Sequence, residues 1–380
     1  MGGPMLMQFD DFVSWANGIL PWIYNVLVWW FNAAWWWVNL VWDFIVILWG
    51  SIFGSTAALA FWFKVVVFPG LVFILMAIIF VVWATRKTWG RIQGRRGPYN
   101  VGKYGGLQLF ADAIKLIGKE SIIPDGAKKW MYRFLPSFLL LIVLLPFVFI
   151  PWDQDWVIVD LSVSLVLIFA FMTAVPVISL FAGWISGSKY TVIGGFRAAN
   201  NQFAAEIPLV LSSVGPALLA GSLSVLDISV VQANSFWFAF LLPINLVTFL
   251  ISAVISVGMV PFDAPVADSE ILFGWRTEFS GIWFVMTYFA EFAEMMFYSA
   301  MIVTLFFGGF SGPAFIPGVV IFLIKLMIVM FFFIILTSSF YRLRQDQIVT
   351  FSWKYLLPLT VFNILLVMFG MAYFGIYIGG

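Results

Sequence analysis

Residues 281–308 read GIWFVMTYFAEFAEMMFYSAMIVTLFFG, and this stretch decides the class of fold. It is longer than the roughly 20 apolar residues with which a helix crosses a bilayer. Its apolar and polar residues do not alternate, which favours a helix over a strand of a membrane barrel. Its only charged residues are Glu291 and Glu294. The stretch therefore predicts a membrane-spanning helix that carries two carboxylates inside the bilayer.

The rest of the chain follows the same pattern. Hydrophobic residues make up 63% of it and charged residues 10%, whereas an ordinary soluble domain has about 25% charged residues. We predict an all-α, polytopic membrane protein with about nine transmembrane helices, several of them kinked by proline, and an amphipathic helix (107–119) on the cytoplasmic surface. The membrane helices are expected near 20–50, 60–84, 134–152, 157–183, 200–226, 236–260, 281–308, 316–340 and 355–377.

Two domains are expected. Residues 1–55 are a tryptophan-rich N-terminal extension with an extra membrane helix, and residues 56–380 form the main transmembrane domain. In the extension, Asn25, Asn32 and Asn39 follow one another at heptad spacing, which puts them on one helix face. A helix that packs on its neighbours is the favoured interpretation of that face, and a lipid or partner contact is the alternative.

The charges predict an orientation. Lysine and arginine are concentrated in 85–133, whereas the loops on the opposite side contain Asp153, Asp155 and Asp227 without any lysine or arginine. Because basic loops stay inside, the N-terminus is expected in the cytoplasm and the C-terminus outside. We expect a multi-pass protein of a prokaryotic plasma membrane, with no cleaved signal peptide.

The composition also excludes several kinds of site. The chain has no cysteine and no histidine, so we expect no metal site, no Fe–S cluster bound by this chain and no haem ligated by histidine. A net charge of +1 argues against a nucleic-acid partner. Proton chemistry must therefore use carboxylates, lysine, tyrosine and water.

Ionisable groups inside the membrane are the candidate functional residues, because they are costly there. Glu291 and Glu294 share a helix face, and one of them is expected to hold a proton since two close carboxylates do not both ionise readily. Lys325 is predicted at a similar depth in the next helix, where it could pair with either. Glu206 lies just before Pro208. A proton or charge relay and a set of static structural groups are the two interpretations.

The segment 261–280, PFDAPVADSEILFGWRTEFS, places four acids and one arginine on the basic side of the membrane. Its proline, glycine and aromatic content favours a folded loop that packs against other residues over a solvated connector.

Four blocks carry a resemblance to a known family. They are RRGPYNVGKYGGLQLFADAIKLIGKE at 95–120, GWISGSKYTVIGGFRAANNQFAAE at 183–206, the segment 261–280 followed by AEF at 290–292, and RLRQDQIVTFSWKYLLP at 342–358. In order and spacing they resemble the quinone-chamber membrane subunit of respiratory complex I, the family called NADH dehydrogenase subunit 1 in mitochondria, from about residue 84 to about 360. The resemblance does not extend to the region before about residue 60.

The resemblance implies a subunit at the junction of the membrane arm and the hydrophilic arm. Together with the soluble quinone-reducing subunits it would enclose a chamber for quinone, the substrate, and link quinone reduction to proton translocation. Fe–S clusters and flavin would belong to partner subunits, and this chain would carry no bound redox cofactor. The other partners implied are the remaining membrane-arm subunits and membrane lipid.

The resemblance also assigns roles to residues. Glu206 and Glu291 match buried acids of the family, and with Glu294 and Lys325 they form the expected relay. The positions expected at the quinone site and the arm junction are Arg96, Asp112, Lys115, Arg197, Asp263, Asp268, Glu270, Arg276 and Glu278.

Several positions depart from the family pattern. Residues that the family usually has as charged groups are here Thr85, Ser256, Met259, Val266 and Thr337. Glu294 is an acid that the family usually lacks. The departures indicate a divergent member, and an archaeal one would fit them. The alternative function is the equivalent subunit of a membrane-bound, energy-converting hydrogenase; a stand-alone transporter and an anchor without chemistry are less compatible with the motifs.

A topology experiment tests the predicted orientation. A reporter fused after Gly380 is expected outside the cytoplasm and one inserted near Gly126 inside, because the predicted outer loops have no lysine or arginine. Paired alkaline phosphatase and fluorescent protein fusions measure this. A cytoplasmic C-terminus would mean that the expected number of helices is wrong by one.

Overall fold

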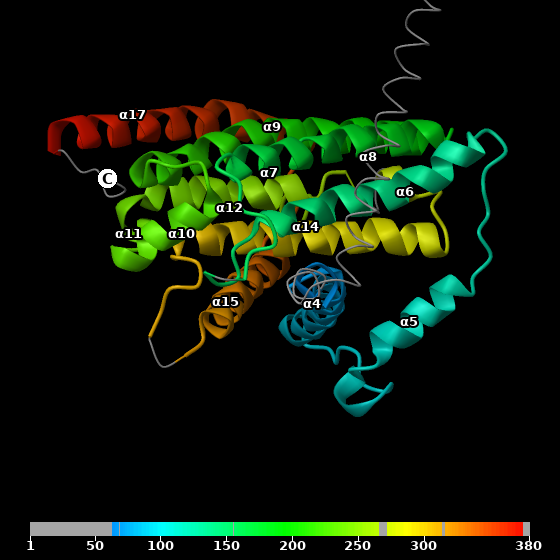
Figure 1. Cartoon of the computed structure of the whole chain (residues 1–380). Coiled ribbons are helices and arrows are strands. Elements are labelled where there is room, and N and C mark those ends of the chain that lie inside the picture. Colours follow the sequence, from blue (N-terminus) through cyan, green and yellow to red (C-terminus); the bar gives the residue numbers. More distant parts are fainter. Residues whose placement is uncertain (1–62, 68, 155, 266–271, 314–315, 375–380) are drawn as a thin grey trace, which may run out of the picture. The chain divides into compact units, whose positions relative to one another are not determined.

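The computed structural model describes residues 63–67, 69–154, 156–265, 272–313 and 316–374. All regular elements in these ranges are helices (Figure 1), which confirms the all-α class. Residues 64–380 belong to one compact unit. The predicted extension 1–55, with its helix near 20–50, lies outside the described residues.

In chain order the elements are η1 (Phe63–Val67), α4 (Leu71–Ile92), η2 (Lys103–Gly105), α5 (Gln108–Ile117), α6 (Lys129–Leu144), η3 (Leu145–Phe149), α7 (Ser164–Met172), α8 (Ala174–Ile185), α9 (Lys189–Ala220), α10 (Val225–Asn234), α11 (Phe238–Leu241), α12 (Pro243–Val257), η4 (Gly274–Arg276), α14 (Ile282–Phe306), α15 (Gly318–Ser339), α16 (Gln345–Phe351), η5 (Ser352–Leu356) and α17 (Leu357–Phe374).

Seven helices of the described residues are long and apolar enough to cross a membrane. They are 64–92, 129–149, 164–185, 189–220, 282–306, 318–339 and 345–373. The shorter apolar helix α12 corresponds to the expected span 236–260. The structure thus contains a counterpart of every expected span except 20–50, and it does not establish the total of nine.

Prolines divide some of these spans and leave others intact. α7 ends at Met172, four residues before Pro176, because a proline ring clashes with the carbonyl four residues earlier. Pro243 is the first residue of α12, where its missing N–H leaves no helical hydrogen bond unmade. By contrast, α9 continues through Pro208 and Pro216. A proline can therefore either end a membrane helix or lie within it, and the packing of neighbouring helices decides between the two.

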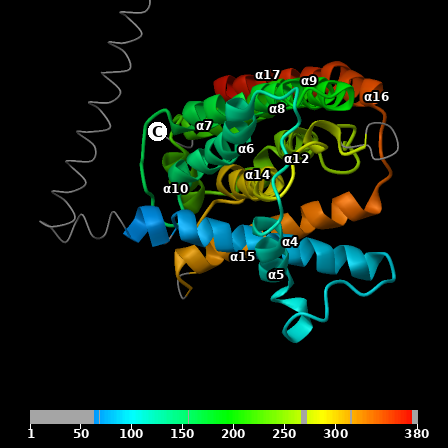
Figure 2. The same cartoon turned by 90° about the vertical axis from the view of Figure 1, so that its right-hand side faces the viewer.

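α14 lies at the centre of the compact unit, between α6 and α12 on one side and α4 and α15 on the other (Figures 1 and 2). Within its most apolar window, 89% of α14 is buried, against 22% for the span 345–373. Glu291 and Glu294 belong to this central helix, so the fold encloses both carboxylates in protein.

The predicted amphipathic surface helix is present as α5. Three of its apolar side chains are turned outward: Phe110, Ile114 and Ile117 are 41%, 71% and 64% exposed. On its polar face, Asp112 forms an ion pair with Arg86 of α4 at 2.6 Å. An outward apolar face is what a helix lying on the membrane surface requires.

Close backbone packing holds η4 against α9. A Cβ atom on Gly194 of α9 would lie 2.6 Å from backbone atoms of Gly274 and Trp275. Because these are backbone atoms, they cannot turn aside as a flexible side chain would. Gly194 therefore fixes the position of Arg276, the last residue of η4.

Gly194→Ala is expected to push η4 away from α9 and to destabilise the protein by about 1–3 kcal/mol, the usual cost of overpacking. Thermal unfolding of the purified complex measures the loss. Gly126→Ala is the matched control, because a Cβ there would meet nothing within 4 Å. Equal stability of the two variants would show that this contact does not hold η4 in place.

Candidate functional site

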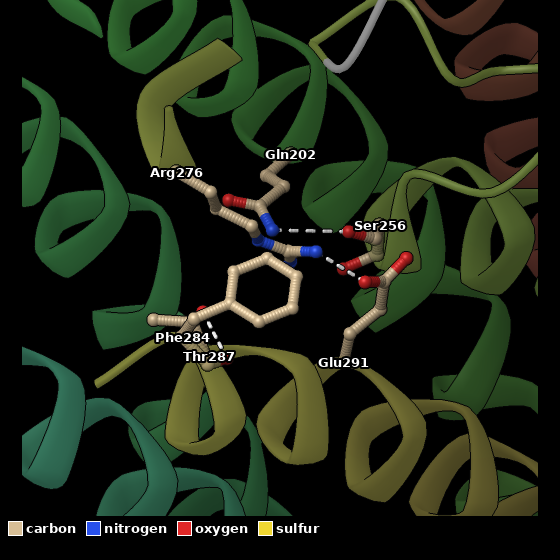
Figure 3. A network of polar contacts seen from close by, with 6 residues as sticks. All are labelled: Gln202, Ser256, Arg276, Phe284, Thr287 and Glu291. Atoms are coloured by element: carbon tan, nitrogen blue, oxygen red, sulfur yellow. Dashed lines mark hydrogen bonds and ion pairs between the residues drawn. The ribbon is translucent and has the colours of Figure 1, made fainter. Parts of the chain in front are cut away.

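An ion pair between Arg276 of η4 and Glu291 of α14 forms the centre of the candidate site (Figure 3). Their side chains are only 9% and 17% exposed. A charge in a protein interior is tolerated when it is paired and hydrogen-bonded. The loop that carries η4 thus inserts a cation among the membrane helices, and Glu291 balances it.

A second carboxylate, Glu294, belongs to a separate set of hydrogen bonds centred on Ser256. Gln202 of α9 donates to the carbonyl of Ser256 at 3.1 Å, as Figure 3 shows. The Ser256 hydroxyl lies 3.2 Å from a carboxylate oxygen of Glu294 and 2.9 Å from the Tyr298 hydroxyl. α9, α12 and α14 therefore each contribute polar groups to this set.

The contact between Ser256 and Glu294 explains one departure from the family pattern. Ser256 stands where the resemblance led us to expect a carboxylate, and Glu294 is the extra acid. The two side chains are hydrogen-bonded, so Glu294 of α14 places a carboxyl group beside Ser256 of α12.

A small cavity of about 30 Å³ lies beside these groups. Its lining includes Asn201, Gln202, Arg276, Glu291 and Glu294. This is about the volume of one water molecule in the liquid, and it is far below the several hundred Å³ of an ordinary ligand pocket. The cavity suits water and proton transfer rather than an organic substrate.

Glu206 is on α9, one helical turn beyond Gln202, and is 7% exposed. Among the described residues its carboxyl group has no hydrogen-bond partner, so the structure gives no sign of a hydrogen-bonded structural acid. A carboxyl group that is not held by another protein group can accept a proton and release it again.

The expected pairing of Lys325 with a carboxylate of α14 is wrong. Its ammonium donates hydrogen bonds of 2.6 to 3.0 Å to three carbonyl oxygens that follow α14, those of Phe307, Gly309 and Ser311. That end of α14 is roughly 20 Å beyond Glu294 at 1.5 Å per residue. The expectation assumed straight antiparallel helices, whereas α15 is inclined to α14 (Figure 1). Lys325 instead stabilises the carbonyl end of α14.

A second polar group joins α4 and α5. Asp112 receives hydrogen bonds from Arg86 at 2.6 Å and from Gln108 at 2.9 Å. Burial raises the pKa of Asp112, but the hydrogen bonds from Arg86 and Gln108 outweigh it and hold the pKa below its usual value. Asp112 therefore stays ionised and fixes the Arg86 side chain.

Two larger cavities meet at Arg86 and Tyr288. One, of about 270 Å³, lies between α4, α5 and α14 and is lined mainly by apolar side chains such as Phe284 and Phe289. The other, of about 710 Å³, is polar and includes Arg95 and Arg96. The apolar cavity therefore lies next to the basic one, and Arg86 and Tyr288 line both.

The remaining candidates are spread around these two groups. Asp263 pairs with Arg342 at 2.7 Å, and the backbone oxygen of Glu278 accepts a hydrogen bond from Tyr132 at 2.5 Å. Lys115 is exposed and Arg197 is half-buried. Asp268 and Glu270 lie outside the described residues.

Four residues of these groups were not among the sequence candidates. They are Arg86, Gln202, Tyr298 and Arg342. Arg342 lies within the block RLRQDQ, which was a signal for it. Gln202 likewise lies within the block at 183–206. Tyr298 carries no such signal, because only the packing of α12 against α14 brings it to Ser256.

Comparison with known proteins places this geometry in context. The model of a family described as NADH dehydrogenase matches residues 63–368. The NADH-quinone oxidoreductase H subunit of Dehalococcoides mccartyi is 38% identical over 312 residues, which covers 81% of this chain and 87% of that protein. The same subunits of Geobacillus kaustophilus and Carboxydothermus hydrogenoformans are 38% and 33% identical, over 82% and 79% of this chain and 96% and 87% of theirs.

The Asp263–Arg342 pair predicts a pH dependence. Burial raises the pKa of Asp263 to about 6, and the nearby Arg342 only partly offsets this. Because this value exceeds the usual 3.8, the folded protein keeps a proton that the unfolded chain has released. The stabilisation is complete below about pH 4 and is lost as the pH rises through about 6.

Asp263→Asn is therefore expected to remove part of the fall in melting temperature between pH 5 and pH 7. No histidine of this chain titrates in that window. Melting curves of the purified complex at both pH values measure the difference. Asp346→Asn is the control, since its side chain is 73% exposed in the Arg344–Asp346 pair. Identical pH dependence in wild type and Asp263→Asn would contradict the prediction.

Proposed function

Because this chain belongs to the NADH dehydrogenase family and is a membrane subunit of the complex I type, we propose that it forms the membrane side of a quinone chamber and couples quinone reduction to proton translocation. Its relatives are H subunits of NADH-quinone oxidoreductases. The observation that carries the coupling proposal is the buried ion pair between Arg276 and Glu291. The names of the relatives favour the quinone enzyme over the hydrogenase.

The apolar cavity between α4, α5 and α14 supports the quinone part of the proposal. A quinone is a flat ring with an apolar tail, and a cavity lined by Phe284, Phe289 and Tyr288 suits such a molecule. Arg86, shared with the polar cavity, can donate hydrogen bonds to the ring oxygens. The acids of the loop, Asp268 and Glu270 among them, are proposed to lie at the mouth of this chamber.

Electrons come from partner subunits. Reduction of a quinone takes up two electrons and two protons, and the Fe–S clusters and flavin that supply electrons are assigned to the soluble subunits. This chain contributes binding, orientation and proton transfer. The cytoplasmic side is proposed to face those soluble subunits, with the N-terminus inside and the C-terminus outside the plasma membrane.

The arrangement of charges suits a relay. Arg276 pairs with Glu291 in a region where an unpaired charge is costly. Glu294 has no cation of its own and is linked to Ser256 and Tyr298 through hydroxyl groups, which can both donate and accept. A change of charge in the chamber shifts the balance at Arg276–Glu291, and the neighbouring carboxyl groups Glu294 and Glu206 exchange protons in response. Lys325 of α15 binds carbonyls beyond the far end of α14. It can therefore influence this exchange only through that end of α14.

The test is proton translocation driven by quinone reduction in proteoliposomes. Glu206→Gln combined with Glu291→Gln is expected to abolish translocation, because both titratable groups are lost. Glu291→Gln alone leaves Arg276 as an unpaired buried cation, which costs about 3–5 kcal/mol. The neutral pair Arg276→Gln with Glu291→Gln therefore separates lost coupling from lost folding.

Glu294→Gln is expected to shift the pH profile rather than to abolish activity, since the amide keeps a hydrogen bond to Ser256. A native gel confirms assembly of each variant. Full translocation in the Glu206→Gln, Glu291→Gln variant would leave these acids as structural groups and refute the relay.

A further inference from the structure

Three helices share a buried polar seam that begins at the carboxylate site and extends beyond it. α9 packs against α12 and α17, side by side in both views (Figures 1 and 2). Each helix presents small polar or very small residues at helical spacing along the contact. On α9 they are Asn201, Ser212 and Gly215, on α12 Asn245, Ser252 and Ser256, and on η5 and α17 Ser352, Thr360 and Asn363. The eight polar members of this seam are each at most 5% exposed.

Two contacts fix the register of the seam. Gln202 reaches the carbonyl of Ser256 near the inner end of α12. Asn245 accepts a hydrogen bond from Asn363 and closes against Gly215 near the outer end. From the level of Asn201 to the level of Gly215 the seam is roughly 21 Å long at 1.5 Å per residue. It therefore runs from the candidate site almost to the outer end of α12.

Five polar atoms of the seam have no partner within the described protein. Several hydroxyls here donate to their own helix, such as Ser212 to the carbonyl of Leu209 and Thr360 to that of Leu357. The hydroxyls of Ser252 and Ser352 do not. The amide nitrogens of Asn201 and Asn245 and the amide oxygen of Asn201 also lack a partner. Unpartnered polar atoms are found elsewhere in the described residues only singly, so their concentration here calls for a ligand.

Water is the ligand that fits these atoms. Buried polar groups in folded proteins are paired with protein or with ordered water. The unpartnered atoms include donors (the amide nitrogens) and acceptors (the amide oxygen and the hydroxyls), and water can serve both. A metal cation would need several oxygen ligands and negative charge, which the seam does not offer. A lipid chain would leave the same atoms unpaired.

We propose that the α9–α12–α17 seam holds a file of internal water molecules, and that this file conducts protons between Glu294 and the outer end of α12. The conduction part rests on the proposed function, which supplies the protons. Ser256 provides the link, because its hydroxyl bonds Glu294 and it also belongs to the seam. Each water accepts a proton on one side and releases one on the other, so no bond or electron is consumed. The neutral serine and asparagine ligands orient the waters without trapping a proton.

Radiolytic labelling tests the water directly. Water bound inside a protein is activated by X-rays and hydroxylates the side chains beside it. Phe249 and Leu356, which are 0% and 2% exposed and adjoin the seam on α12 and η5, should be labelled in the intact wild-type complex. Ser252→Val, which fills the seam with two methyl groups, should abolish this labelling.

Proton translocation tests conduction. Ser252→Val should lower the rate of proton translocation about fivefold, the effect of losing about one hydrogen bond, while the complex still assembles and reduces quinone. The matched control is Ser299→Val, because the Ser299 hydroxyl is buried but bonded to the carbonyl of Met295 in its own helix. Ser252→Ala is the milder variant if valine prevents assembly. In a dry seam it removes an unpaired hydroxyl and raises the melting temperature; in a hydrated seam it does not.

The outcomes separate the two proposals. Unlabelled Phe249 and Leu356 in the wild type, or a more stable Ser252→Ala variant, would overturn the water file. Labelling with undiminished translocation in Ser252→Val would overturn conduction. If the Glu206→Gln, Glu291→Gln variant translocates fully while Ser252→Val does not, the carboxylate relay fails and the seam stands.

Discussion

A guanidinium buried among membrane helices needs a carboxylate beside it, and the Arg276–Glu291 pair meets this requirement. Much of the fold serves to bring the two groups together. Gly194 lets η4 approach α9 closely enough to direct Arg276 inward, and the central position of α14 encloses Glu291. The loop between α12 and α14 is therefore an integral part of the helix bundle, since it supplies the cation that pairs with Glu291.

The same requirement explains how the site tolerates sequence change. Where the family pattern led us to expect an acid, this chain has Ser256, and Glu294 provides the carboxylate from the facing helix. A hydrogen bond between the two keeps the acid at the same place in space. A pattern read along α12 alone does not reveal this carboxyl group, because it comes from another helix.

Polar groups in this protein fall into two kinds that differ in cost. Charged groups occur as pairs, at Arg276–Glu291, Arg86–Asp112 and Asp263–Arg342, because an isolated charge is expensive away from water. Neutral amides and hydroxyls line the contact of α9, α12 and α17, where small side chains allow close helix approach. The charged groups can respond to a change of charge nearby, whereas the neutral ones can order water without holding a charge of their own.

The amino-acid sequence determined the membrane class, the helical composition and most of the spans, because runs of apolar residues have few alternatives in a bilayer. It also identified Glu206, Glu291, Glu294 and Arg276 as candidates, through their chemistry and the family resemblance. It could not place Lys325, whose ammonium binds carbonyls at the end of α14. Counting residues along two helices does not reveal the angle between the helices. The partnership of Ser256 with Glu294 and of Gln202 with α12 was decided by tertiary structure alone. Such contacts join residues far apart in the chain, and only the packing of helices fixes which faces meet.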